Sequence, residues 1–146
     1  MKQRRPLVRW LGVALIALAT SACMSLTDPM DREGEFREQQ RNFSQYVRWG
    51  NFQGAAAFLK EDQRGDFLAL APELSDVRFT DYEIMTFEMR DNSHATVNVL
   101  YTGYRLSSPT SRPMLLRQEW ERDGGDSWHV KIDLEPMRAA LGLAAK

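Results

Sequence analysis

The residues from Met114 to Leu134 alternate between apolar and polar side chains, and this pattern constrains the fold more than any other stretch. The alternation is interrupted by the run Asp123-Gly124-Gly125-Asp126. Alternation of this kind is typical of strands with one buried face, and a Gly-rich interruption between two such runs predicts a hairpin. A register that places Trp120 opposite Trp128 puts both apolar rows on one face. We therefore predict an antiparallel hairpin that forms one wall of the core.

A second alternating pair of segments precedes this hairpin. The segments Asp81 to Arg90 and Ala95 to Tyr101 flank the turn-forming residues Asp91 to Ser93. A three-residue turn there pairs Met89 with Ala95 and, further from the turn, Phe87 with Val97 and Met85 with Val99. The same alternation places Tyr82 and Ile84 on the face opposite to Phe87. The Ser/Thr/Pro-rich segment from Leu106 to Pro113 is predicted to be a loop that connects the two hairpins.

The chain before the strands has helical periodicity. Apolar residues between Phe36 and Val47 recur at helical spacing, Gly50 is a typical helix C-terminal cap, and Asn51 is a typical N-terminal cap for the next helix. Gly65 marks the expected end of that second helix, and a third is expected at residues 66–74.

Helices followed by antiparallel strands predict a single α+β domain at residues 35–136, with helices packed on a curved antiparallel sheet. Residues 137–146 are expected to form a C-terminal tail, either a weak amphipathic helix or a frayed end. The start of the first helix is open between Asp28 and Glu35, because Asp28 before Pro29 is a good helix start.

Residues 1–22 have the anatomy of a bacterial export signal. Four basic residues precede the apolar run Trp10 to Ala19, and small residues at 20–22 precede Cys23, the only cysteine. The sequence Thr20-Ser21-Ala22-Cys23 resembles the lipobox of bacterial lipoproteins. This resemblance implies cleavage before Cys23, acylation of its sulfur and, because Met24 follows, placement at the outer membrane facing the periplasm. Residues 23–34 would then be a lipidated tether.

Cleavage by the ordinary signal peptidase is the alternative, because small residues at Thr20 and Ala22 also suit it. That enzyme would release a soluble protein with an N-terminal thiol. In either case the four basic residues Lys2, Arg4, Arg5 and Arg9 are lost, and the formal charge changes from −1 to −1 − 4 = −5. An acidic domain argues against nucleic-acid binding.

Three segments resemble the nuclear transport factor two-like superfamily, the cone-shaped α+β fold that ketosteroid isomerase and polyketide cyclases also use. They are Tyr46 to Ala56, Leu74 to Tyr82, and the final hairpin from Gln118 to Val130. The resemblance implies a cone-like domain. Because the superfamily contains enzymes as well as binding and docking domains, it implies no activity. Family enzymes can place an Asp base and Tyr donors inside the cone. The residues here that could serve are Asp81, Tyr82, Tyr101 and Tyr104. The predicted alternation of the strands places them on both faces of the sheet.

The sequence contains no catalytic signature. It has no His/Cys cluster at metal-ligand spacing, no Gly-rich phosphate loop and no nucleophile elbow. His94 beside a turn and His129 on a polar strand face are expected to be exposed to solvent. We therefore predict no catalytic residue, no metal and no cofactor.

Four residues are candidates for a pocket or a partner contact. Gln118 is the one amide on an apolar row, Trp120 and Tyr101 belong to the same predicted interior, and Trp49 ends the first helix beside Gly50. The predicted function is a non-enzymatic, lipid-anchored envelope protein whose domain docks a partner or self-associates. The alternative is a binding protein for small apolar molecules, or an isomerase or lyase, with a pocket inside the cone.

Overall fold

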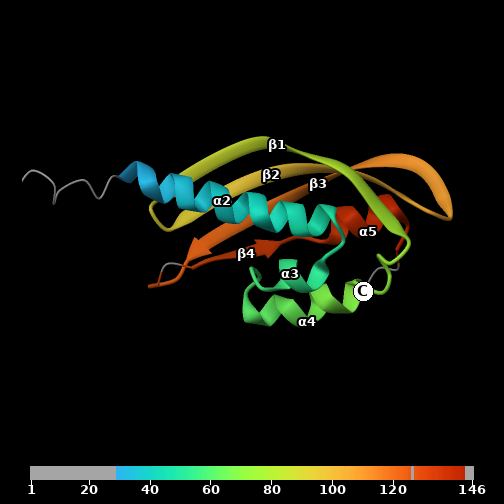
Figure 1. The fold of residues 1–146 in the computed structure, drawn as a ribbon, viewed down its shortest axis with the longest axis horizontal. Helices are drawn as coiled ribbons and strands as arrows, with labels where there is room; N and C mark the ends of the chain where they lie inside the picture. Colours follow the sequence, from blue (N-terminus) through green and yellow to red (C-terminus); the bar gives the residue numbers. More distant parts are fainter. Residues whose placement is uncertain (1–28, 126, 144–146) are drawn as a thin grey trace, which may run out of the picture.

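Four antiparallel strands form a meander in the order β1-β2-β3-β4, and the sheet curves over the long helix α2 (Figure 1). The computed structural model describes residues 29–125 and 127–143. The strands are β1 (Val77–Asp91), β2 (His94–Arg105), β3 (Ser108–Arg122) and β4 (Trp128–Ile132). The helices are α2 (Pro29–Arg48), α3 (Phe52–Ala56), α4 (Glu61–Leu70) and α5 (Glu135–Leu141). This arrangement confirms the predicted α+β class, with N-terminal helices packed on a curved antiparallel sheet.

Helix α2 begins at Pro29, the early end of the range left open by the sequence. Proline suits the first turn of a helix because its missing N–H would have no partner there. Residues 29–34, which were assigned to the tether, are therefore helical. The apolar stripe of α2 faces the sheet, with Phe36, Phe43 and Val47 no more than 2% exposed.

The division between the next two helices differs from the prediction. Asn51 caps α3 as expected, since its Oδ1 accepts a hydrogen bond from Gly54 N at 2.9 Å. However, α3 ends at Ala56, and Gly65 lies inside α4 instead of ending a helix. The break comes earlier because Lys60 is extended and bonds to the sheet, so a new helix starts at Glu61.

Residues 58–60 cover the free edge of β4. Val130 N donates to Phe58 O at 2.7 Å, and Lys60 N donates to Val130 O at 3.3 Å. Leu59 thereby forms an isolated parallel bridge with Val130. This short pairing ties the helical layer to the last strand.

The prediction of a loop from Leu106 to Pro113 is wrong. Only Leu106 and Ser107 form the turn, and β3 begins at Ser108 and pairs with β2 through Arg112 and Pro113. Strand β4 pairs with β3 only from Gln118 onward, so the first half of β3 has a single strand neighbour. A strand segment with one free edge tolerates proline, whose missing N–H weakens a central strand.

The final hairpin has the predicted faces but a different register. Trp120 pairs with Val130, and Trp128 pairs with Arg122 instead of Trp120. The connection is therefore five residues long, from Asp123 to Ser127. Because the register differs by an even number of residues, both tryptophans still point inward, and each is 2% exposed.

The first hairpin pairs Met89 with Ala95 and Phe87 with Val97, as predicted, but Val99 pairs with Ile84 instead of Met85. The turn closes through an Asp91–His94 pair, one residue tighter than expected.

Strand β1 carries irregularities at three positions, where the register shifts past Thr80, Met85 and Arg90. An extra residue reverses the alternation of side chains. Tyr82 and Phe87 consequently both pack against the core, although the uninterrupted pattern placed them on opposite faces. At the first irregularity, the Arg48 guanidinium at the end of α2 donates to Thr80 O through Nε and Nη2, at 3.2 and 2.9 Å.

The tail after Pro136 adopts the helical alternative. Helix α5 ends at Gly142, whose φ of 64° suits glycine, and it packs against β3. Met137 and Leu141 are 1% and 5% exposed, so this helix contributes to the core.

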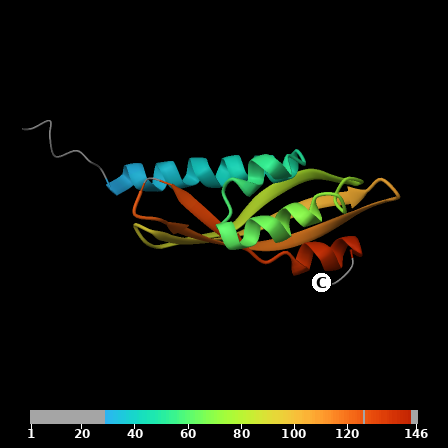
Figure 2. The ribbon, with the colours of Figure 1, turned by 90° about the horizontal axis from the view of Figure 1, so that it is seen from below.

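One end of the molecule gathers three segments that are distant in sequence. The start of α2, the β1–β2 turn and the β3–β4 connection lie at the same end in both views (Figures 1 and 2). Arg122 N donates to Ser93 O at 2.8 Å, and the Arg122 guanidinium lies 3.9 Å from Glu35. The last residues of α2 and Trp49 lie at the other end of the helix.

Candidate functional site

The interior of the domain holds a cluster of polar side chains centred on Gln118, which is 0% exposed. Gln118 Oε1 accepts hydrogen bonds from Trp120 Nε1 at 3.1 Å and from Gln40 Nε2 at 3.3 Å. Gln118 Nε2 lies 3.5 Å from the Tyr101 hydroxyl, and Gln40 Nε2 also donates to Ser44 Oγ at 3.0 Å. Strands β2 and β3 and helix α2 thus meet at one interior network.

The network consists of amides, hydroxyls and an indole. Burial raises the pKa of Tyr101, and the hydrogen bonds of its hydroxyl with Ser44 and Gln118 only partly oppose this effect. Tyr101 therefore stays protonated at neutral pH and acts as a hydrogen-bonding group. A general base needs a pKa near the working pH, and Tyr101 does not have one. The arrangement is suited to fixing strands and helix relative to one another.

A cleft between α2 and β1 opens beside this network. Its volume is about 130 Å³. Its lining residues are Phe36, Arg37, Gln40, Arg41, Tyr82, Ile84, Phe87 and Val97. Pockets for drug-sized ligands usually measure about 300–1,000 Å³. The cleft can hold only a small molecule or a part of a larger one.

A wider groove of about 350 Å³ lies over the ends of β2, β3 and β4. Its charged side chains are of both signs: Lys60, Arg90, His94, Glu119, Glu121 and Lys131. Lys60 pairs with Glu121 and lowers the pKa of that carboxyl, and Glu119 lies 3.1 Å from Arg117. The groove is mixed in charge and open to solvent, with neither sign clearly dominant.

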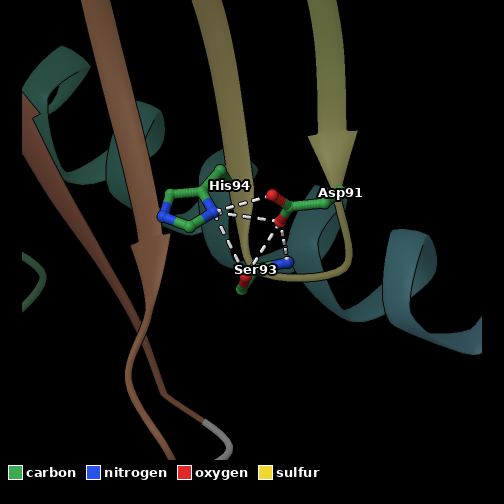
Figure 3. Close-up of polar contacts among 3 residues, drawn as sticks. All are labelled: Asp91, Ser93 and His94. Atoms are coloured by element: carbon green, nitrogen blue, oxygen red, sulfur yellow. Dashed lines mark hydrogen bonds and ion pairs between the residues drawn. The ribbon is translucent and has the colours of Figure 1, made fainter.

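Asp91, Ser93 and His94 form a polar constellation at the β1–β2 turn (Figure 3). Asp91 Oδ1 accepts from Ser93 N at 2.7 Å and from Ser93 Oγ at 2.8 Å, and the Asp91 carboxylate lies 3.0 Å from His94 Nδ1. Ser93 Oγ lies 3.2 Å from the same Nδ1. In a catalytic triad the histidine uses its two nitrogens for the two partners. Here both partners share one nitrogen, so the constellation stabilises the turn.

The two histidines differ in exposure. The His94 side chain is 48% exposed, as expected, whereas His129 is 23% exposed and its Nε2 lies 3.1 Å from Asp123 Oδ2. Among residues 29–125 and 127–143, no three His, Cys, Asp or Glu side chains are placed to hold a metal ion.

Of the four predicted contact residues, the structure brings together Gln118, Trp120 and Tyr101. Trp49 lies apart from them at the end of α2, where it is 75% exposed and the Arg48 guanidinium lies 4.9 Å from its ring. Cys23 lies outside the described residues, and so do the predicted export signal and the first part of the tether.

Two members of the interior network, Gln40 and Ser44, were not identified from the sequence. Both fall on the apolar stripe of α2, four and eight residues after Phe36, and this position is a usable signal of burial. Of the Asp and Tyr candidates, Tyr82 and Tyr101 lie together, with their rings 5.9 Å apart. Asp81 is exposed, and its carboxylate accepts a hydrogen bond from Tyr82 N. Tyr104 lines a different pocket, beside α5.

No protein-family model matches this sequence, and no curated protein matches it. Among solved structures, the chain is similar to a candidate polyketide cyclase from Silicibacter sp. TM1040, with a TM-score of 0.47 and 16% identity. The alignment covers 75% of this chain and 95% of that one. A similarity at this level supports no residue role, and none is transferred. Within the described residues, no helix is both long and apolar enough to cross a membrane.

Proposed function

We propose that this chain is a lipid-anchored protein of the bacterial cell envelope, held at the periplasmic face of the outer membrane by acylated Cys23, and that its domain docks a protein partner. The observation that carries the docking role is that the polar side chains at the centre of the interior bond to one another. The central amide, Gln118, is bonded by Gln40, Trp120 and Tyr101 of the same chain. This leaves the surface as the place where a large partner can be recognised.

The proposed anchor gives the domain an orientation. Pro29 follows Cys23 by six residues, so an extended tether reaches about 20 Å at most. Helix α2 has 20 residues and therefore extends about 30 Å from its first residue. The start of α2 and the two hairpin ends beside it are therefore held near the lipid surface, whereas Trp49 can lie up to about 30 Å further from it.

Trp49 is the best candidate for the partner contact. Its side chain is 75% exposed, and Tyr46, one turn earlier, is 37% exposed. Tryptophan, tyrosine and arginine are enriched among the residues that dominate binding energy at protein interfaces, and Arg48 lies beside Trp49. Self-association is the variant of this proposal in which the partner is a second copy.

The anchor is tested by membrane fractionation and acyl labelling of the wild type and of Cys23→Ala. We expect the wild type to carry the label and the variant to leave the membrane fraction or remain unprocessed. An unlabelled wild type with unchanged fractionation of the variant would reject the anchor.

The docking role is tested with a photo-crosslinking residue at position 49 in intact cells, with position 45 as the control. Gln45 is exposed in the last turn of α2, four residues before Trp49. We expect a reproducible adduct from position 49 that is much weaker from position 45. An adduct of twice the chain's mass would identify self-association. The absence of any reproducible adduct from either position would argue against docking through this end.

A second candidate function is the binding of a small molecule in the cleft between α2 and β1. The observation that favours it is Ile84, which lines the cleft and is 44% exposed although it is a large apolar residue. The lining contains neither a carboxylate nor a histidine, so the candidate is a binding site without a general base. Chemical-shift changes in Tyr82 and Ile84 on adding a small aromatic probe, either benzyl alcohol or benzoate, would support it, and the absence of changes with both probes would remove it.

A further inference from the structure

We propose that the cleft between α2 and β1 selects an organic carboxylate with a small apolar body, of about the size of one aromatic ring. This inference rests on the second candidate function above and adds the chemical class of the ligand. It follows from three features of the cleft: the cations at its rim, the apolar residues beneath them, and its volume.

The rim carries two arginines one helical turn apart. Arg37 Nε and Nη2 lie 2.8 and 2.7 Å from Glu33 Oε1, but both side chains of this pair are about half exposed, and exposed pairs of this kind contribute little. Arg41 has no ion pair with any described residue. Like charges at this spacing on a helix repel each other, so an anion between them would relieve the repulsion.

The Arg37 guanidinium is already positioned over the cleft. It lies 4.3 Å from the centre of the Phe87 ring, and Phe87 is itself a lining residue. An arginine held against an aromatic face still presents N–H groups at its edges, and those on Nη1 of Arg37 make no hydrogen bond within the described residues, whereas Nε and Nη2 donate to Glu33. Arginine binds carboxylates through two parallel hydrogen bonds, which gives both affinity and orientation.

Tyr82 supplies a further donor in the lining of the cleft. The Tyr82 hydroxyl makes no hydrogen bond within the described part of the chain, although its ring packs on Tyr101. Arg37, Arg41 and Tyr82 are all donors, and the lining has no carboxylate that would repel an anion. The polar part of the cleft therefore matches an acceptor-only group such as a carboxylate.

The remaining lining is apolar and small. Phe36, Ile84, Phe87 and Val97 form it, and Ile84 is the exposed member. A cavity of about 150 Å³ lined by such residues is known to bind benzene. At about 130 Å³ the cleft matches a body of that size and excludes a polycyclic ligand. An inorganic anion would leave this apolar surface uncovered.

The test measures binding to the full chain in detergent by NMR titration with three probes: benzoate, its neutral analogue benzyl alcohol, and inorganic phosphate. We expect benzoate to bind at least tenfold more tightly than either of the others. Arg41→Gln should weaken benzoate binding roughly tenfold, because a hydrogen bond to a charged group is lost, and should leave benzyl alcohol binding unchanged. Arg112→Gln is the control, since this exposed arginine lies on β3, away from the cleft.

Each outcome is decisive. Equal binding of benzoate and benzyl alcohol, or an Arg41→Gln variant that binds benzoate like the wild type, overturns the carboxylate assignment and leaves the small-molecule site intact. Phosphate binding as tight as benzoate binding would show a response to charge alone and would also overturn it. Failure of both aromatic probes to bind removes the small-molecule site together with this inference.

Discussion

Replacing Gln118 by leucine tests whether the interior network stabilises the domain. Leucine has a similar size but cannot accept a hydrogen bond, so the Trp120 N–H, which now donates to Gln118 at 3.1 Å, is left buried without an acceptor. Gln40 keeps its hydrogen bond to Ser44. A buried donor without a partner costs about 1–3 kcal/mol. We expect the free energy of unfolding to fall by about this amount, with a Tm lower by about 3–6 °C per kcal/mol for a domain of this size.

The measurement is guanidinium-induced unfolding of the purified protein. A double-mutant cycle with Trp120→Phe isolates the hydrogen bond, because phenylalanine keeps a ring but has no N–H. In that background Gln118→Leu should cost at least about 1 kcal/mol less than in the wild type. Arg117→Leu, on the exposed neighbouring residue, is the control and should change stability by no more than about 0.5 kcal/mol. A Gln118→Leu cost that matches the control, or that is equal in both backgrounds, would refute the reasoning.

Three further substitutions test particular parts of the fold. Gly103→Ala places a Cβ 2.9 Å from Arg78 O and should lower the free energy of unfolding by about 1–3 kcal/mol, measured by chemical denaturation. Gly65→Ala, inside α4 with no heavy atom within 4 Å of the new Cβ, should raise it by about 0.5–1 kcal/mol in the same assay. A loss of stability here would contradict the helix assignment. The pKa of Asp91 is lowered by hydrogen bonds from the Ser93 backbone N–H, the Ser93 hydroxyl and His94. Ionised Asp91 therefore stabilises the fold above the unfolded-state pKa of about 4. This stabilisation is lost as the pH falls through the lower pKa of the folded state. Asp91→Asn should therefore lower Tm at pH 7 and flatten its decline below about pH 4, and an unchanged profile would show that the turn contributes nothing.

The sequence predicted the features that depend on alternation and helical spacing. The inward rows of β2 and of the final hairpin, the Asn51 cap and the α+β class follow directly from these patterns. Their common cause is that a strand or helix with one buried face must repeat apolar residues at its own period.

The features that the sequence did not predict depend on contacts between distant residues. Nothing local marks Met85 as an irregularity that returns Tyr82 and Phe87 to the same side. The break before α4 is set by the pairing of Leu59 with Val130 and not by Gly65. The start of β3 has the composition of a loop, and only its pairing with β2 holds it extended.

The candidate site also contains residues that the sequence identified and residues that it did not. Gln118 was identifiable as a polar residue on an apolar row, and its neighbours Tyr101 and Trp120 share the interior with it. Its partner Gln40 lies 78 residues earlier, and the two arginines at the cleft rim lie on the solvent side of an ordinary amphipathic helix. Only the packing of α2 against β1 reveals that these side chains surround one cleft.

The three irregularities of β1 affect whether the edge of the sheet can pair with a second molecule. Strand β1 ends the sheet and has β2 as its one strand neighbour in the described chain, so a flat 15-residue β1 would be a template for backbone pairing between molecules. Interruptions past Thr80, Met85 and Arg90 divide it into runs too short and too bent to align with a second copy. Deleting all three of these residues would restore an uninterrupted alternation along β1, and we expect that variant to aggregate more readily than the wild type.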